Sequence, residues 1–279
     1  MSEDYINECL KGKLLHGDDF NIDQINKWFS EEKEGYSNLD SEELKELSNN
    51  VYHYHNLNLL YGFSFLKDKN LFSKVLGIGA AGGHEFEPIK NKIKELHILE
   101  PSDNLRTNKI SGVDINYKTP TISGKMDYQD NYFNLITSFG VLHHIPNVSF
   151  VISEIYRVLD FGGYFLVREP IISMGDWRNK RDGLTKNERG IPKHIFKEII
   201  EKNNFEIVSE SYCFTLTTFF NKTVGRFLKH PIFYYRSYLL FDKFLSKLFE
   251  NNVTYFTKNK FNKLYPQNVY FVLKKKQIG

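Results

Sequence analysis

The stretch from Lys74 to Glu85, which reads KVLGIGAAGGHE, constrains the fold more than any other part of the chain. It begins with apolar residues typical of a buried strand, continues with a run of Gly and Ala, and ends in a polar segment that we expect to be helical. Such a turn lets backbone N–H groups approach a ligand closely, because no Cβ stands in the way, and a following helix N-terminus favours negative charge. The sequence therefore predicts a strand, a ligand-binding turn and a helix.

The spacing of the small residues in this turn fits two templates. Gly77, Gly79 and Gly82 match the G-x-G-x-x-G fingerprint of dinucleotide-binding proteins. Gly79, Ala81 and Gly83 match a looser pattern in which small residues alternate with any residue. A glycine-rich turn in an unrelated α/β protein is a further alternative, so the following segments must decide.

Composition limits the class of protein. The chain has 279 residues, of which 41% are hydrophobic and 25% charged, and a net charge of +3, which gives no reason to expect nucleic acid as a partner. Cys9 and Cys213 stand in unrelated contexts without metal-ligand spacing, so we expect reduced thiols and no metal site. There is no signal-like N-terminus and no run of about 18 apolar residues, which predicts a cytoplasmic protein without a transmembrane segment.

Beyond Val75, short apolar runs alternate with helical patterns. Alternation of this kind predicts βαβ units in a doubly wound, mostly parallel α/β sheet, with ligands bound beyond the carboxyl ends of the strands. We expect strands at Glu95–Glu100, Phe133–Phe139, Gly163–Arg168, Phe205–Phe214 and Gln267–Lys275, and helices at Ser149–Asp160 and Pro192–Asn203.

Two segments lie outside this pattern. We expect residues 1–70 to form a helical lid, with helices at Asp18–Glu34 and Ser41–Leu66. Residues 215–265 are rich in Phe and Tyr and are basic, since twelve Lys and Arg stand against two acids between Phe214 and Gly279. This insertion is interpreted as a long aromatic helix that serves as a substrate cap, a dimer face or a patch on an anionic surface; a solvated charged face is the plain alternative. The core then comprises residues 71–214 and the last strand at 266–279.

The segment Met126–Pro146 (MDYQDNYFNLITSFGVLHHIP), with Glu100 and the later EIYRVLDFGG, carries a family resemblance. It resembles the class I S-adenosylmethionine-dependent methyltransferases, and among them the small-molecule branch of type 11. The landmarks are Met126-Asp127-Tyr128, Phe133-Asn134 and Leu142-His143-His144, and the resemblance covers about residues 74–170.

This resemblance implies a Rossmann-like, seven-stranded sheet with an antiparallel last strand, and S-adenosylmethionine as the cofactor. The turn would hold the methionine moiety, Glu100 the ribose, and Ser138 and Phe139 would lie near the sulfonium. The chain departs from the family pattern at Gly77, where an acid is usual, and at Ile122. The residues implied to bind cofactor are Gly77, Gly79, Ala80, Ala81, Gly83, Glu100, Pro101, Met126, Asp127, Ser138 and Phe139.

An enzyme that transfers a hydride needs catalytic residues in addition to the glycine-rich turn. A short-chain dehydrogenase or sugar epimerase needs a Tyr-x-x-x-Lys pair in which the lysine lowers the pKa of the tyrosine. The match in this chain, Tyr270 to Lys274, lies in the last expected strand, which disfavours an NAD(P)-dependent sugar-modifying oxidoreductase. That enzyme and a non-catalytic cofactor-binding or interaction protein remain the alternatives.

For methyl transfer to an alcohol, a base must take up a proton. His144, and after it His143, are the candidates, since imidazole titrates near neutral pH, and a histidine at the matching place is the acid–base partner in phosphobase methyltransferases, which the segment resembles locally. The residues proposed to bind an anionic acceptor are Arg168, Glu169, Arg178 and Arg181. We therefore predict O-methylation of a small polar molecule, such as a phosphorylated sugar or sugar nucleotide in surface-polysaccharide biosynthesis.

Overall fold

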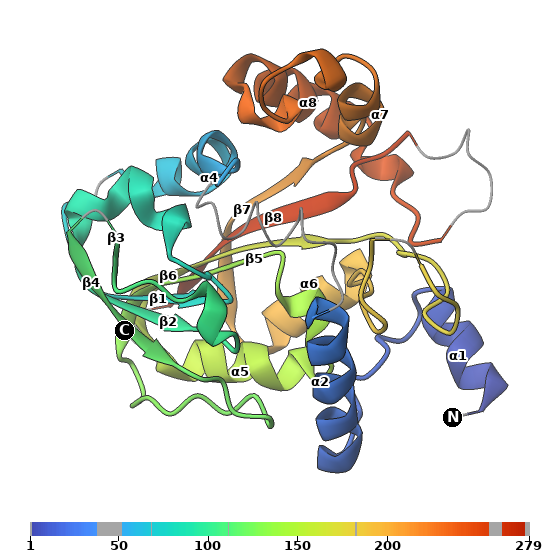
Figure 1. Ribbon diagram of the computed structural model, residues 1–279, viewed down its shortest axis with the longest axis horizontal. Coiled ribbons are helices and arrows are strands. Elements are labelled where there is room, and N and C mark those ends of the chain that lie inside the picture. Colours follow the sequence, from blue (N-terminus) through green and yellow to red (C-terminus); the bar gives the residue numbers. More distant parts are fainter. Residues whose placement is uncertain are drawn as a thin grey trace.

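The protein is described here by a computed structural model, in which residues 2–37, 52–67, 69–110, 112–181, 183–256 and 264–276 are described, without the side chains of residues 33–37. Eight strands form one sheet in the order β3-β4-β2-β1-β5-β6-β8-β7 (Figure 1). Their bounds are β1 Phe72–Ile78, β2 Ile93–Leu99, β3 Lys109–Ile110, β4 Val113–Lys118, β5 Phe133–Phe139, β6 Leu159–Pro170, β7 Phe205–Cys213 and β8 Asn268–Lys275.

The predicted doubly wound sheet is confirmed, with one difference in the strand count. The strands β4, β2, β1, β5 and β6 run parallel, and β8 lies antiparallel between β6 and β7, as expected for the last strand. The eighth strand is β3, which spans only two residues and pairs antiparallel with β4 at the edge of the sheet. Its small size explains why no apolar pattern predicts it.

Helices cover both faces of the sheet. On one face α4 (His55–Tyr61) and α8 (Arg236–Leu248) lie above the strands, and on the other α5 (Val148–Val158) and α6 (Lys193–Lys202) lie below them (Figure 1). Each layer buries its own apolar cluster against the sheet, because consecutive side chains of a strand point to opposite faces. The central strands are buried on both faces and read as nearly continuous apolar runs.

The segment after the glycine-rich turn is a 3₁₀ helix, His84–Lys92, and not an α-helix. Pro88 lies inside it, and proline removes a backbone donor and crowds the preceding turn. The N-terminus of this short helix nevertheless directly follows Gly83, so the predicted strand–turn–helix order holds.

The N-terminal part contains α1 (Glu3–Leu10), α2 (Ile22–Ser37), α4 and a 3₁₀ turn at Phe63–Leu66. The predicted helix at 18–34 corresponds to α2. Of the helix predicted at 41–66, residues 41–51 lie outside the described part of the chain. The division into a lid, a core and an insertion stays a prediction.

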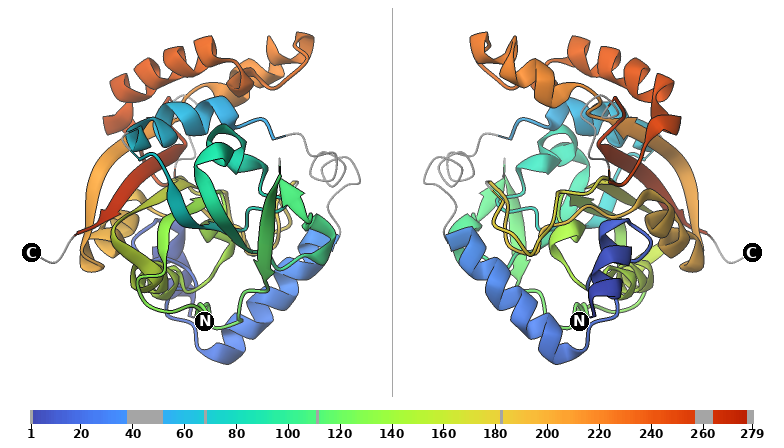
Figure 2. Two further views of the ribbon diagram at one scale, coloured as in Figure 1. Left: turned by 90° about the vertical axis from the view of Figure 1, so that its left-hand side faces the viewer. Right: turned by 90° about the vertical axis from the view of Figure 1, so that its right-hand side faces the viewer.

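The insertion is not one long helix. It contains α7 (Thr217–Lys222), 3₁₀ turns at Gly225–Phe227, Ile232–Tyr234 and Glu250–Asn252, and α8, with Pro231 between α7 and α8. Figure 2 shows α7 and α8 on the outside of the molecule, beyond β7 and β8. No helix in the described ranges is long and apolar enough to span a membrane.

Candidate functional site

The glycine-rich turn connects β1 to the 3₁₀ helix at the carboxyl edge of the sheet. Gly79, Ala81 and Gly83 all have positive φ, at 61°, 45° and 76°. A Cβ on Gly79 would lie 2.8 Å from the methyl groups of Val141, so only glycine fits this close approach of two loops. The turn therefore exposes backbone and no side-chain bulk beside the loop that follows β5.

Gly77 has a different role, since its φ is not positive. A Cβ there would lie 2.6 Å from the Cβ of Ala80 and 3.0 Å from the ring of Phe86. Phe86 is fully buried and packs where an acidic side chain would otherwise project. The departure from the family pattern is thus built into the core, and Gly77 offers no side chain to a ligand.

Glu100 joins the glycine-rich turn to the loop after β2. Its carboxylate accepts hydrogen bonds from the N–H of Ala81 at 3.1 Å and of Ser102 at 3.0 Å. Burial raises the pKa of this carboxyl, and the two backbone hydrogen bonds oppose that rise. Each oxygen keeps a second lone pair, so the carboxylate can also accept hydrogen bonds from a diol.

The other predicted cofactor residues differ in exposure. The Ser138 side chain is buried, and its hydroxyl has no hydrogen-bond partner among the described residues. It pairs in register with Ile78 at the end of β1 and so lies next to the turn. Met126 is buried with its N–H bonded to Glu154, whereas Pro101 is exposed and Asp127 pairs with Lys118 on the surface.

The His143–His144 turn follows β5 and is held by Glu169 from the end of β6. The buried carboxylate of Glu169 accepts hydrogen bonds from the N–H of Val141 at 3.0 Å, of Leu142 at 2.9 Å and of His143 at 3.3 Å. It also bonds Nδ1 of His143 at 2.7 Å. Glu169 was predicted to bind substrate, but four contacts within the protein already engage it.

The environments of the two histidines differ sharply. Burial by itself lowers the pKa of His143, but hydrogen bonds to Glu169 and Glu188 outweigh it and raise that pKa to about 9. Burial and the neighbouring charge of His143 lower the pKa of His144, despite a hydrogen bond from its Nδ1 to Glu32 at 3.1 Å. The two environments thus favour the protonated form of His143 and the neutral form of His144.

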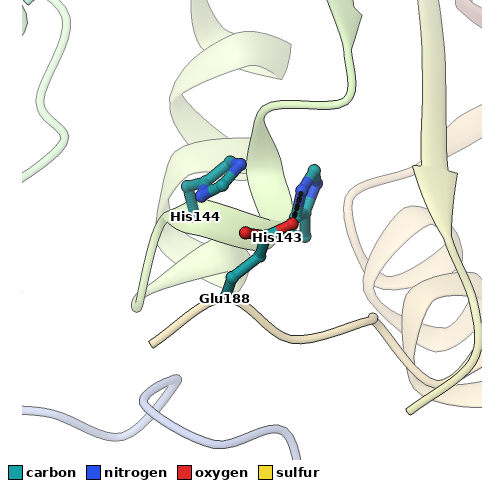
Figure 3. Close-up of side chains that lie close together, drawn as sticks. All are labelled: His143, His144 and Glu188. Carbon is teal, nitrogen blue, oxygen red and sulfur yellow. Dashed lines mark ion pairs between the residues drawn. The ribbon is translucent and has the colours of Figure 1, made fainter. Parts of the chain in front are cut away.

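Glu188 completes this cluster from the loop that follows β6 (Figure 3). Its carboxylate lies 3.5 Å from Nε2 of His143, and the N–H of Thr185 donates to it at 3.1 Å. His143, His144 and Glu188 offer ligand atoms within 4.8 Å of one another and could hold a cation. Both ring nitrogens of His143 already contact carboxylates, so ion pairing accounts for this geometry as it stands.

The side chain of Arg168, at the end of β6, is buried against aromatic rings. Its guanidinium lies 4.2 Å from the ring centre of Tyr54 and 5.7 Å from that of Phe214. Nε and Nη1 have no hydrogen-bond partner among the described residues, although the side chain is 94% buried. Buried polar groups are nearly always hydrogen-bonded, so this guanidinium can bind an acceptor that the described residues do not supply.

Glu85, in the first turn of the 3₁₀ helix, is an acid whose charge interacts with this guanidinium. Glu85 bonds the hydroxyl of Thr137, and burial raises the pKa of its carboxyl to about 7, against the charge of Arg168. It influences the guanidinium through its charge, with no hydrogen bond between them in the described structure.

The structure does not group the predicted arginines. Arg178 forms a bidentate pair with Asp176 on the surface. Arg181 donates to the carbonyl oxygens of four residues of its own loop, Met174, Thr185, Lys186 and Glu188. Both guanidinium groups are thus engaged within the loop, whereas Arg168 is not.

Sequence analysis missed Glu32, Glu85 and Glu188 as members of the site. Glu85 directly follows the glycine-rich turn, which is a usable indication of its place. Glu32 lies 112 residues before His144, and no local pattern connects the two.

Residues 76–167 match the sequence profile of the family described as "Methyltransferase domain". This match decides the identity of the core. Residues 76–167 are a methyltransferase domain. "Probable polyketide synthase 41" of Dictyostelium discoideum is 26% identical over an alignment of 117 residues that covers 37% of this chain, and the chain spans 5% of that protein's length.

Solved methyltransferases share the fold of this domain. A SAM-dependent methyltransferase of Leishmania major has a TM-score of 0.55 at 12% identity, covering 88% of this chain and 83% of that one. An N-methyltransferase of Haemonchus contortus, solved with phosphomonomethylethanolamine and S-adenosylhomocysteine, has a TM-score of 0.51 at 17% identity, covering 80% of this chain and 53% of that one. At these identities the likeness shows the fold alone.

The residues present fit S-adenosylmethionine, the cofactor of this family. The site combines a cradle that a Cβ on Gly79 would fill, a buried carboxylate with free lone pairs at Glu100, and an unpartnered hydroxyl at Ser138. All three lie at the carboxyl edge of adjacent parallel strands, where such sheets bind ligands.

Proposed function

We propose that this chain transfers a methyl group from S-adenosylmethionine to an oxygen atom of a small polar acceptor. The observation that carries the proposal is the position of the paired histidines on a loop that contacts the glycine-rich turn, with Nδ1 of His143 bonded to Glu169 at 2.7 Å and Nδ1 of His144 to Glu32 at 3.1 Å. Burial lowers the pKa of His144, which favours the neutral form that a base requires. Val141, two residues before His143, is the residue against which Gly79 packs. The base is thereby held next to the cradle.

Bound S-adenosylmethionine supplies an electrophilic methyl group, and the chain's own residues do the rest. Glu100 and the glycine-rich turn hold the nucleoside and the methionine moiety, which fixes the direction of attack. His144, whose Nδ1 bonds Glu32, can accept the hydroxyl proton as the new bond forms. The charged His143, bonded to Glu169 and Glu188, keeps His144 neutral between turnovers.

Calorimetric titration with S-adenosylmethionine, S-adenosylhomocysteine, NAD and NADP tests the cofactor. We expect binding of the two sulfur nucleotides alone. Glu100→Gln should weaken it by about tenfold or more, since a hydrogen bond to a charged group contributes about 1.5–3 kcal/mol. Glu95→Gln, on the same strand but bonded to His97, is the matched control and should bind normally. Binding of NAD instead would restore the oxidoreductase interpretation, and binding of none would support a non-catalytic protein.

We further propose that the acceptor carries a carboxylate or phosphate. Arg168 supports this, because its buried guanidinium contacts aromatic rings and lacks an acceptor for Nε and Nη1 among the described residues. Arg is the side chain best suited to bind such planar or tetrahedral anions. Arg178 and Arg181, assigned to this role from the sequence, stay predictions, as do a cytoplasmic location and a place in surface-polysaccharide biosynthesis.

Arg168→Met should raise the acceptor KM by about tenfold or more, because a charge-assisted hydrogen bond is lost, and leave S-adenosylhomocysteine affinity unchanged. Arg178→Met is the matched control, because that side chain is exposed and paired with Asp176. If Arg168→Met weakened S-adenosylhomocysteine but not 5′-methylthioadenosine, which lacks the amino-acid part, Arg168 would bind the cofactor carboxylate. The proposal of an anionic acceptor would then be wrong.

A further inference from the structure

The helix α8 buries two polar side chains together with Tyr238 and Leu239. Its polar residues Asp242 and Ser246 face the protein and are fully buried. Asp242 accepts hydrogen bonds from the N–H of Phe214 at 2.7 Å and of Thr215 at 2.9 Å, and Ser246 bonds the Thr215 hydroxyl at 2.7 Å. The outward side of α8 carries Leu240, Phe241, Phe244 and Leu248, with Arg236 and Lys247 beside them.

Large apolar side chains gather on this outward side and on the neighbouring α7 and 3₁₀ turn, and we call them the α7–α8 surface. Their exposed fractions are 59% for Phe219, 48% for Val224, 78% for Phe227, 51% for Leu240, 46% for Phe241, 67% for Phe244 and 62% for Leu248. Single exposed apolar residues are ordinary, but a group of this kind on adjacent elements indicates a binding surface.

Basic residues are interspersed with these apolar side chains along the sequence. Residues 217–248 contain the basic residues Lys222, Arg226, Lys229, Arg236, Lys243 and Lys247. The acidic residue in this range is Asp242, which is buried on the inward side of α8. Glu250, just beyond α8, is paired with Lys247 at 2.7 Å. The α7–α8 surface is therefore apolar and positively charged at once.

The position of the surface leaves it open to a flat partner. Figures 1 and 2 show α7 and α8 at one end of the molecule, where α8 packs inward on β7 and α4 and its other side faces away from the sheet. In the described ranges, α5 and α6, on the other face, lie away from it.

We propose that the α7–α8 surface docks the protein on an anionic lipid membrane. Aromatic and Leu side chains interleaved with Lys and Arg are the composition of helices that lie in the membrane interface, where apolar burial and attraction to anionic headgroups add. A second copy of this chain fits less well, because a two-fold contact places the same patch on both sides and brings like charges together.

Flotation with vesicles of phosphatidylcholine, alone and mixed with phosphatidylglycerol, tests the proposal on the full chain. We expect binding to the anionic vesicles at physiological ionic strength, falling as salt is added. Phe227→Ser with Phe244→Ser should weaken binding by about tenfold or more, because apolar burial is lost. Lys222→Gln with Lys229→Gln should weaken it by roughly fivefold for each cation removed.

The control is Phe150→Ser, a comparable exposed Phe on α5, which should bind like the wild type. All these side chains are exposed, so the variants should keep the wild-type unfolding temperature, which is measured in parallel. A wild type that does not float with anionic vesicles would overturn the proposal, as would unchanged flotation of the Phe227/Phe244 variant. So would a dimer in solution that the Phe244→Ser change converts to a monomer.

Discussion

His144→Gln is expected to lower the turnover number of methyl transfer by about 10²–10⁴-fold, the usual contribution of a positioned general base. Glutamine can still accept a hydrogen bond, but it cannot take up the hydroxyl proton as the methyl group is transferred. Binding of S-adenosylhomocysteine should stay unchanged, because the turn and Glu100 hold the nucleoside. Release of S-adenosylhomocysteine at saturating acceptor, found by a metabolite screen, measures the effect.

A matched control separates this role from a general loss of histidine. His194→Gln, at an exposed position on α6, should turn over like the wild type. If His144→Gln kept full turnover, His144 would be a structural hydrogen bonder between Glu32 and the turn.

The pH dependence of turnover independently tests the assignment of His144 as the base. Because burial and the charge of His143 lower the pKa of His144, turnover should already be at its plateau at pH 7 and fall only below the ordinary histidine range. His143→Gln removes that positive charge, so the acidic limb should move to higher pH. A limb that did not move would mean that another group is the base.

Much of the fold is predictable because the core strands are buried on both sides. Runs such as Phe133–Phe139 are buried over most of their length, and their order with the helices fixes the sheet topology. The strand β4 was not predicted, although it alternates polar Asp114 and Asn116 with half-buried Val113, Ile115 and Tyr117, which is the pattern of a half-buried strand. Its place depends on pairing with β2, which is a tertiary contact.

Site residues could be predicted only where they come directly after a strand. Gly79, Glu100 and the His143–His144 turn end three strands, and parallel strands bring their ends together. Arg181 shows why the other site residues could not be predicted. Its guanidinium binds four backbone carbonyls, and the sequence does not distinguish such an arginine from one that binds phosphate. Which donors are consumed depends on loops that meet only in the folded chain.

Arg189 provides the second prediction with a large effect, and it concerns stability. Its guanidinium is buried and donates to the carbonyl oxygens of His16 at 2.7 Å, His143 at 2.8 Å, Ile145 at 3.0 Å and Pro146 at 3.1 Å. It also lies 5.0 Å from the ring centre of Trp28. The residue therefore joins the N-terminal helices to the turn that carries the two histidines.

Arg189→Met should lower the free energy of unfolding by about 3–5 kcal/mol, because several buried carbonyls lose their donor together. Burial lowers the pKa of Arg189 to about 10, which still leaves the guanidinium charged at neutral pH, so the charged hydrogen bonds are the ones removed. Urea unfolding gives the change, and Arg178→Met, an exposed arginine, is the control and should stay within about 0.5 kcal/mol of the wild type.

Hydrogen exchange distinguishes a local effect from a general one. If Arg189 is the link between the N-terminal segment and the site, amides of α2 and of the His143–His144 turn should lose protection together in Arg189→Met, while β1 and β5 keep theirs. Loss in the strands as well would mean that Arg189 supports the whole core. Retained protection of α2 would mean that other contacts, such as the bond from the Trp28 indole to the His144 carbonyl at 2.7 Å, hold the helix in place without it.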